Sequence, residues 1–417
     1  MRFLPRAVGA RLLVACASLV AGSGIALGQT PVPAPGQPAA GQRILHFRPD
    51  DIHTRRGFDY FYNLDYDKAV REFELALELQ PKDPFAVNHL LSGVIFKEMY
   101  RIGALDSELY AKDAFLSSKQ FPMDPNVKAR IRELTERSLA LSEEKLKANS
   151  SDIDALYTRG VTRGLHAMYI GLIEKAWFSA LRSAVGARHD HEKVLELNSN
   201  YSDAKMIVGI HNYVIGSLNL ATKVAASIVG LSGSKKKGIE YLYDTVNGGG
   251  ENTVDAAIAL ALFLRREQRY AEAIKLIDGL SAFYPHNFLF ALELANLYNA
   301  AGHGPEAIAA YRGILSRAQS GVYGEPRLGM VYYGLAEALR GQRDYAGAAE
   351  AYDKALQNPR IDPDLRARAT LGAGEMYDLI NKRDDAVKRY EAVIAADGSG
   401  AHAEIARKRL KEPYQNR

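Results

Sequence analysis

Cysteine is almost absent from this chain. Its 417 residues include a single cysteine, Cys16, which lies inside an apolar segment near the N-terminus. If that segment is removed, the mature chain has no thiol. This excludes a disulfide framework, a zinc site built on cysteines and a cysteine nucleophile.

The chain also lacks a strong net charge. Lysine plus arginine number 53 and aspartate plus glutamate number 49, which gives a formal net charge of +4. Residues 1–28 contain three arginines and no acidic residue, so their removal would leave a net charge of +1. A nearly neutral surface has no electrostatic footprint for nucleic acid, and we expect none as a partner.

Long apolar runs are missing beyond the N-terminus, although a membrane-spanning helix needs about 20 such residues. The N-terminus itself combines Arg2, Arg6 and Arg11 with an apolar core that ends in Ala-Leu-Gly, which is typical of a secretory signal peptide. We predict a signal peptide over residues 1–28 and a Pro/Gly/Ala linker over residues 29–48. The mature protein is then expected in the periplasm or at the periphery of the outer membrane.

Cys16 leaves one alternative for this segment. The run Leu-Val-Ala-Cys that ends at Cys16 fits a bacterial lipobox, which would make Cys16 a lipidated N-terminus. Only four residues separate Arg11 from Cys16, and most of the apolar core follows the cysteine. This order favours the signal peptide.

Catalytic and cofactor motifs are missing as well: the sequence has no H-E-x-x-H, no G-x-S-x-G and no Rossmann fingerprint. The densest group of potential metal ligands is His-Asp-His-Glu at residues 189–192, which lacks the spacing that places two histidines on one helix face. Within it, His191 stands at a position that is aromatic in the repeated segments described below. His166 and His211 have no nucleophile motif beside them, so we expect packed histidines. We expect no metal, no cofactor and no catalysis.

What the chain does contain is a recurring spacing of small and aromatic residues, with a period near 34 residues. It occurs in five segments, at Gly57, Tyr60, Ala69, Phe73, Ala76 and Pro81; Ala261, Leu264, Ala273, Ile277, Leu280 and Pro285; Ala295, Tyr298, Ala307, Tyr311 and Ile314; Ala336, Leu339, Ala348, Tyr352 and Ala355; and Gly374, Tyr377, Ala386, Tyr390 and Val393. This pattern resembles the tetratricopeptide repeat (TPR) family over most of the mature length. The resemblance implies helical hairpins stacked into a solenoid.

The spacing has a physical reason that does not depend on the family. Small residues such as Gly57 and Ala69 let the two helices of a hairpin approach closely, while Phe73 fills the space beside the crossing. We therefore predict an all-α, TPR-type solenoid of about eight hairpins with a C-terminal capping helix. Residues 49–250 form an array with insertions and lengthened hairpins, and residues 251–417 form a regular array that ends in the cap.

Two units in the middle of the chain are longer than the rest. The segments GLHAMYIG, from Gly164, and GIHNYVIG, from Gly209, match each other, and each continues through apolar sequence to Gly186 or Gly230. We predict that each first helix extends by about ten residues, or about 15 Å. Two hairpins of this array are then lengthened and apolar nearly all round.

The apolar extensions, residues 164–187 and 209–231, allow two interpretations. They form a side core by packing on each other, or they form an exposed ledge for a membrane surface, a lipid or an apolar partner. In the second case interfacial anchors are expected at Lys175, Trp177, Arg182, Lys223, Lys235, Lys236 and Lys237.

The stretch VAASIVGLSGSKKKG, residues 224–238, looks like a phosphate-binding loop but departs from one. A P-loop that begins at Gly230 would need a glycine at Lys235 and a serine or threonine at Lys237. We predict instead that VAASIV ends a long helix and that Ser234 caps the next one. Residues 205–265 also resemble, more weakly, the tetratricopeptide-39 or inclusion-body-clearance family, which is linked to lipid and aggregate handling.

In TPR arrays the first helix of each hairpin lines a concave groove. Here these helices carry a mixed set of polar residues, at Arg265, Asn296, Asn299, Tyr333, Glu337, Arg340, Glu375 and Asp378. The set does not reproduce the Lys-Asn clamp with which some TPR domains bind a peptide carboxylate. We therefore predict an exported scaffold that binds protein or peptide segments in this groove, with a lipid- or membrane-binding repeat protein as the alternative.

Overall fold

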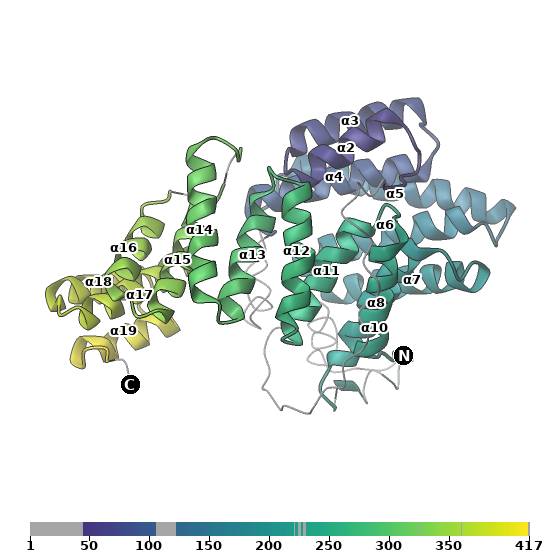
Figure 1. Cartoon of the computed structure of the whole chain (residues 1–417). Coiled ribbons are helices and arrows are strands. Elements are labelled where there is room, and N and C mark those ends of the chain that lie inside the picture. The colour runs from purple at the N-terminus through teal and green to yellow at the C-terminus, as the bar shows by residue number, and fades with distance from the viewer. Residues whose placement is uncertain are drawn as a thin grey trace. The chain divides into compact units, whose positions relative to one another are not determined.

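The structure is a computed structural model that describes residues 45–105, 122–220, 222–223, 227, 231–324, 326–359 and 361–415. These residues form seventeen α-helices and one isolated bridge, which pairs His46 with Gly250. The chain divides into two compact units, Met1–Arg266 and Glu267–Arg417 (Figure 1). The predicted signal peptide and most of the predicted linker lie outside the described residues.

Unit 1 begins with an extended segment and continues through nine described helices. They are α2 (Ile52–Tyr62), α3 (Tyr66–Leu79), α4 (Pro84–Ile102), α5 (Pro125–Ala148), α6 (Ile153–Leu172), α7 (Trp177–Leu197), α8 (Ser202–Ser217), α10 (Lys235–Gly248) and α11 (Thr253–Arg266). Consecutive helices pack as the pairs α2/α3, α4/α5, α6/α7 and α8/α10, and α11 packs on α10. The predicted array boundary at residue 250 precedes α11, whereas the division into units follows it.

Unit 2 holds the remaining helices. They are α12 (Tyr270–Phe283), α13 (Phe288–Ala300), α14 (Gly304–Gln319), α15 (Leu328–Gly341), α16 (Tyr345–Leu356), α17 (Pro363–Leu379), α18 (Arg383–Ala396) and α19 (Ala401–Lys411). The pairs α13/α14, α15/α16 and α17/α18 are hairpins, and α19 packs on α17 and α18. With α11 and α12 counted as a pair in chain order, the prediction of an all-α array of about eight hairpins with a capping helix is confirmed.

The small and aromatic residues of the repeat meet as their spacing predicts. Phe73 of α3 is fully buried, and a side chain added at Gly57 of α2 would overlap its ring. A side chain added at Gly93 of the following helix would stand 3.1 Å from the same ring. The ring therefore joins its own hairpin to the next one, and larger residues at these glycines would push the helices apart.

His191 takes the position of this ring in the long hairpin α6/α7. The imidazole is fully buried and would overlap a side chain added at Gly160 of α6. Its ring packs edge to face against Tyr157, with centroids 5.3 Å apart. The prediction that His191 fills an aromatic position of the repeat is confirmed.

The turn of this hairpin differs from the sequence prediction. Helix α6 ends at Leu172, Lys175 adopts a left-handed φ of 56°, and the N–H of Ala176 donates to Ile170 O over 2.9 Å. Helix α7 then runs unbroken past Gly186, where the turn was predicted. Apolar sequence on both sides of the true turn hides it. Helices of 20 and 21 residues nevertheless confirm that this hairpin is lengthened.

The second long hairpin is also built differently. Helix α8 ends at Ser217, and Leu218 is extended with ψ of 150°, so the predicted first helix does not run unbroken to Gly230. Most of the VAASIV run lies outside the described residues. Ser234 is the N-cap of α10, as predicted, and its hydroxyl accepts from the N–H of Lys237 over 3.4 Å.

Helices α8 and α10 touch through their backbones. A side chain added at Gly238 would lie 2.6 Å from the backbone N of Tyr213 and 2.7 Å from the carbonyl oxygen of Gly209. The three lysines that precede Gly238 are exposed, whereas Gly238 itself is buried against α8. None of the described helices is both long enough and apolar enough to cross a membrane.

Candidate functional site

Five of the predicted groove residues come together on two neighbouring first helices of unit 2. We call this surface the α15–α17 face. Its members are Tyr333, Glu337 and Arg340 of α15 and Glu375 and Asp378 of α17. Helices α15 and α17 touch each other, and α19 packs beside them on α17. The three- and four-residue spacing along each helix places these side chains on one side.

Ion pairs hold the centre of the α15–α17 face. Arg340 lies 2.9 Å from Glu375, whose other oxygen lies 3.4 Å from Arg409 of α19. Glu375 is buried, with 7% of its surface exposed. Burial acts to lower the pKa of Arg340, but Glu375 and the neighbouring tyrosines outweigh it, and this pKa is raised. The Arg340 guanidinium therefore stays charged beside this buried carboxylate.

Tyrosines surround this centre as hydrogen-bond donors. Tyr352 of α16 donates its hydroxyl to Glu337, and the Arg368 guanidinium lies 5.0 Å from the centre of the Tyr333 ring. Burial and the nearby Glu337 raise the pKa of Tyr333 to about 12. Burial and the same glutamate also raise the pKa of Tyr352. The phenols therefore remain protonated.

Asp378 forms the other end of the α15–α17 face. Only 1% of its side chain is exposed, and its carboxylate lies 2.8 Å from Arg383 Nη1. The same carboxylate accepts from the Tyr390 hydroxyl and from the backbone N–H of Tyr414, each over 2.8 Å. An anion this deeply buried needs several donors, and here the chain end supplies one of them.

Residues that follow the last helix thus lie on the α15–α17 face. The N–H group of Arg340 donates to the Tyr414 hydroxyl over 2.9 Å. The guanidinium groups of Arg409 and Arg340 lie 4.6 and 5.3 Å from the centre of the Tyr414 ring. Sequence reasoning did not single out Tyr414, Arg409 or Arg383, because they follow the repeat pattern or fall on second helices.

Three predicted groove residues also have a role inside their own hairpin. Asn296 accepts from the Tyr311 hydroxyl over 2.7 Å, as Glu337 accepts from Tyr352 and Asp378 from Tyr390. In each case a tyrosine of the second helix reaches a polar residue of the first. These contacts brace the hairpin, so each residue serves the fold as well as the surface.

The remaining predicted groove residues lie elsewhere. Asn299 is half-buried on α13, and Arg265 is half-buried near the end of α11 in unit 1. The structure thus brings together the α15 and α17 members of the predicted set. The roles of all eight residues in binding stay a prediction.

The predicted membrane anchors form separate groups. Lys175 and Trp177 lie at the turn before α7, with the ammonium 5.6 Å from the centre of the indole, and Arg182 is exposed on α7. Burial lowers the pKa of Lys175 to about 8. Lys223 is exposed, as are the three lysines at the start of α10, Lys235, Lys236 and Lys237. Lys237 lies 5.2 Å from the Tyr241 ring, and Lys236 lies 3.9 Å from Glu240.

The potential ligands at residues 189–192 are engaged with neighbouring side chains. Asp190 is fully buried between Arg159 and Arg163, at 2.6 and 2.7 Å. Arg188 pairs with Glu192 at 2.9 Å. In the described part of the chain, no three histidine or acidic residues are arranged to hold a metal ion.

The two matched histidines are packed among neighbours. His166 lies 3.3 Å from the Ser183 hydroxyl, and burial lowers its pKa. His211 Nε2 lies 3.0 Å from Arg188 Nη1. Burial and this arginine lower the pKa of His211 to about 4. Neutral rings in these places serve packing.

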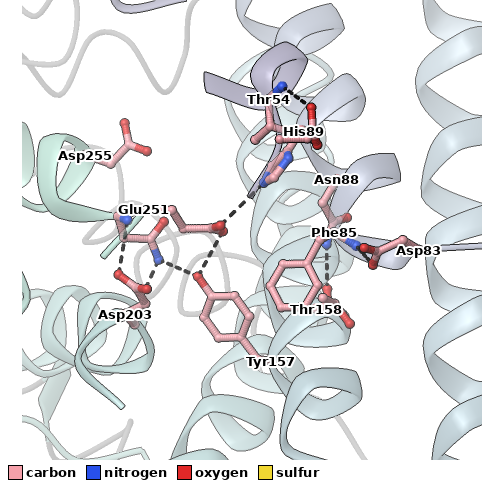
Figure 2. Close-up of polar contacts among 12 residues, drawn as sticks. Thr54, Asp83, Phe85, Asn88, His89, Tyr157, Thr158, Asp203, Glu251 and Asp255 are labelled. Atoms are coloured by element: carbon pink, nitrogen blue, oxygen red, sulfur yellow. Dashed lines mark hydrogen bonds and ion pairs between the residues drawn. The ribbon is translucent and has the colours of Figure 1, made fainter. Parts of the chain in front are cut away.

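Sequence reasoning missed a buried polar cluster in unit 1. Figure 2 shows Glu251 reaching toward His89 and the Tyr157 hydroxyl, at 3.5 and 3.4 Å. Asn252 donates to Tyr157 over 2.9 Å, and its backbone N–H donates to Asp203 over 3.1 Å. These residues come from α4, α6, α8 and the α10–α11 connection, and their distance in sequence leaves no local signal.

Acidic groups outnumber basic ones in this cluster. Burial and Glu251 raise the pKa of Asp203 to about 6. Burial raises the pKa of Asp255 to about 6 as well, with Glu251 adding to the effect against a hydrogen bond from Tyr62. The cluster therefore takes up protons more readily than free carboxylates do.

The N-terminal segment closes this cluster. His46 donates its backbone N–H to Gly249 O over 3.1 Å, and Phe47 is buried against Phe58 with ring centroids 4.5 Å apart. Arg48 pairs with Asp154 at 2.6 Å. These residues stand at the end of the predicted linker, and in the structure they pack against the helices of unit 1.

Unit 2 also contains an open cleft of about 870 Å³ between α16, α17, α18 and α19. Two of its charged groups face each other as an ion pair, Arg389 with Asp353 at 2.7 Å. Arg366, also on its wall, reaches the carbonyl oxygen of Leu356 over 3.3 Å. These polar groups bind one another across the cleft.

Solved structures of other helical-repeat proteins align with parts of this chain. The C-terminal part of a TPR repeat-containing protein from Cytophaga hutchinsonii aligns with a TM-score of 0.45 and 14% identity, over 65% of this chain and 94% of that chain. The described helices form an α-solenoid of the TPR type, in which successive helical hairpins pack on one another. PilW, described as a widely conserved type IV pilus biogenesis factor, aligns with a TM-score of 0.41 and 14% identity, over 59% and 97% of the chains.

A third TPR structure, MamA from Desulfovibrio magneticus RS-1, covers 43% of this chain and 94% of its own, with a TM-score of 0.34 and 16% identity. No protein-family model matches the sequence, and no curated protein matches it. The TPR-type fold is seen in the repeated contact between small residues and buried rings.

Proposed function

We propose that this helical-repeat protein is an exported, non-catalytic scaffold that binds protein or peptide segments on the α15–α17 face. The observation that carries the proposal is that a non-helical piece of polypeptide already lies there. Tyr414 is held by its backbone N–H on Asp378 and by its phenol on Arg340. A surface with partners for both the backbone and a side chain can bind a peptide in a defined register.

The charge on this face supports binding more than chemistry. Arg340 and Arg409 flank Glu375, and Arg383 neutralises Asp378. The raised pKa of Tyr333 keeps its phenol protonated. These groups serve as fixed donors and acceptors.

Export is the part of the proposal that rests on the sequence. The three arginines, the apolar core and the Ala-Leu-Gly end of residues 1–28 support a signal peptide, which would deliver the scaffold to the periplasm or the outer-membrane periphery. A near-neutral mature chain favours protein partners over nucleic acid.

A capture experiment tests the binding face. Tagged mature protein is incubated with bacterial envelope extract, as wild type, as Arg340→Ala and as Lys354→Ala. Arg340→Ala leaves Glu375 paired with Arg409 at 3.4 Å, so the fold is expected to remain. Lys354 is the matched control, a basic residue on the second helix α16 that pairs with Glu350.

We expect Arg340→Ala to lose the captured proteins and Lys354→Ala to retain them. Thermal melting of all three proteins checks that the loss is not caused by unfolding. Equal capture by the wild type and Arg340→Ala would remove the α15–α17 face from the proposal.

One observation favours the alternative of a membrane or lipid surface. Phe178 and Val185 are 55% and 37% exposed, and their seven-residue spacing places them on one side of α7. Lys175 and Trp177 precede Phe178 at the start of α7, and Arg182 stands between Phe178 and Val185 in the sequence of the helix. An exposed apolar stripe beside basic residues and an indole is a feature of helices that lie in a membrane interface.

Liposome flotation tests this alternative with vesicles that contain anionic lipid. The double variant Phe178→Ser, Val185→Ser should lose binding, whereas Ile52→Ser should not, because Ile52 is the one exposed large apolar side chain of α2. If the wild-type protein stays with the unbound fraction, the membrane alternative is wrong.

A further inference from the structure

Tyr414 is held on the α15–α17 face through both its side chain and its backbone. Its hydroxyl accepts from Arg340 over 2.9 Å, and its backbone N–H donates to Asp378 over 2.8 Å. Arg409 lies 4.6 Å from the ring centre. A phenol that meets a guanidinium at its oxygen and another near its ring is recognised as tyrosine, and not only as an apolar group.

The neighbours of Tyr414 contribute little to this attachment. Glu412, Pro413 and Gln415 are exposed, while Tyr414 is half-buried. The helix before them is fixed independently, because Ala403 and Ala406 of α19 are buried. The tail is therefore attached through one aromatic residue, as a short peptide ligand would be.

The face remains complete when the tail is removed. Asp378 keeps Arg383 at 2.8 Å and the Tyr390 hydroxyl at 2.8 Å, and Arg340 keeps Glu375 at 2.9 Å. No buried charge depends on Tyr414 alone. The C-terminal carbonyls of α19 are also satisfied without it, since Arg383 donates to Arg409 O and Leu410 O over 2.9 and 2.8 Å.

We infer that the α15–α17 face recognises a tyrosine within an extended peptide segment, and that Tyr414 of the same chain occupies this site as a competing internal ligand. This inference rests on the proposed function and adds the chemistry of the partner. The partner presents a tyrosine with a free backbone N–H, in a segment without strong net charge, because the arginines and carboxylates of the site balance. A partner must displace Tyr414 to bind.

Competition within one chain sets the size of the effect. A short tethered ligand has an effective concentration in the millimolar range. For a peptide that binds with a dissociation constant near one tenth of that concentration, the tail weakens external binding by about tenfold. Removal of Tyr414 should therefore strengthen the binding of the external peptide by about tenfold.

The experiment uses the full mature chain and a fluorescently labelled heptapeptide, Lys-Glu-Pro-Tyr-Gln-Asn-Arg, which is the C-terminal sequence. Anisotropy is measured with the wild type, Tyr414→Ala, the matched control Gln415→Ala, and the double variant Tyr414→Ala, Arg340→Ala. We expect Tyr414→Ala to bind the peptide about tenfold more tightly than the wild type and the control, and the double variant to lose binding.

The peptide is varied as well. Alanine in place of its tyrosine should abolish binding, and phenylalanine should weaken it about fivefold through loss of the hydrogen bond to Arg340. Equal affinity of Tyr414→Ala and wild type, or equal binding of the tyrosine and alanine peptides, would overturn the inference. A melting temperature of Tyr414→Ala that falls by more than about 5 °C, without a gain in binding, would also overturn it by showing a structural cap.

The two proposals fail separately. If the peptide does not bind but capture from the extract still depends on Arg340, the scaffold stands and the tyrosine inference falls. If the peptide binds Tyr414→Ala but capture ignores Arg340, the site recognises tyrosine and the proposed scaffold function falls.

Discussion

The buried imidazole of His191 makes the stability of unit 1 depend on pH in a way that one substitution can remove. Its Nδ1 lies 2.9 Å from Ala187 O, and its Nε2 has no hydrogen-bond partner. Burial lowers the pKa of His191 to about 4, although the Ala187 carbonyl and Asp190 act in the opposite direction. Folding therefore favours the neutral ring.

The magnitude follows from this shift. A pKa that falls from 6.5 to about 4 corresponds to about 3 kcal/mol between the two protonation states. Because the folded pKa is depressed, this stability is present above about pH 6.5 and is lost as the pH falls toward 4. Between pH 7.5 and pH 5, His191 alone should remove about 2 kcal/mol from the free energy of unfolding, since only the unfolded ring takes up a proton.

The substitution His191→Phe tests this directly. Phenylalanine fills the same position in α3, where Phe73 packs on Gly57, and it does not titrate. Trp177 is the single tryptophan of the chain and begins the same helix, so its fluorescence reports the unfolding of unit 1. Guanidinium unfolding curves at pH 7.5, 6 and 5 give the free energies of the two proteins.

We expect the free energy of unfolding of His191→Phe, relative to the wild type, to rise by about 2 kcal/mol between pH 7.5 and pH 5. Any offset in the free energy of unfolding that is the same at every pH adds to this change and reports only how well the larger ring fits. His189→Gln, an exposed residue on the same helix, is the control and should follow the wild type. Parallel pH profiles for His191→Phe and the wild type would refute the reasoning.

Three further substitutions have expected outcomes. Asp255→Asn should stabilise unit 1 by about 2 kcal/mol at pH 7.5, because burial raises this pKa to about 6, and tryptophan-detected unfolding should show the gain shrinking toward pH 5. Gly238→Ala should cost about 2–3 kcal/mol in the same assay, since its Cβ would lie 2.6 Å from Tyr213 N; wild-type stability would contradict this. Ser234→Ala removes the acceptor for the Lys237 N–H and should cost about 1 kcal/mol, seen as faster hydrogen exchange confined to the first turn of α10.

The fold could be predicted wherever the spacing of small and aromatic residues in the sequence determines which side chains touch between two helices. A ring such as Phe73 can fill the crossing of two helices only if small residues face it, and Gly57 and Gly93 do. The same rule predicted that His191 takes the position of the ring, and in the structure it lies against Gly160. These contacts are local to one or two hairpins, so the period of the sequence specifies them.

Turns inside apolar sequence could not be predicted in the same way. The chain reverses at Lys175, a residue with no preference for left-handed backbone, and apolar residues continue on both sides. Glycine at 186 gave a stronger turn signal but lies within α7. Packing of α6 on α7 decides the reversal, and packing overrides local propensity.

The composition of the α15–α17 face was predictable in part for a related reason. Arg340 and Glu375 fall on first helices by the repeat period, so their side of the array follows from the sequence. Their meeting with Tyr414 does not, because the tail returns to α15 and α17 from beyond the last helix. The unit 1 cluster was hidden in the same way, since His89 and Glu251 meet only after several hairpins have stacked.

Both described ends of the chain lie against side chains of first helices, but they are held differently. At the N-terminal side, Phe47 is buried against Phe58 and the backbone of His46 is bonded to Gly249, so displacement would expose an apolar ring and break a main-chain bond. At the C-terminal side, the attachment is one half-buried tyrosine, Tyr414. Its displacement would leave the charged groups of the α15–α17 face paired with one another. A partner can replace Tyr414 by offering the same group, whereas it would have to unfold part of unit 1 to replace Phe47. Exchange with a partner is therefore expected on the α15–α17 face.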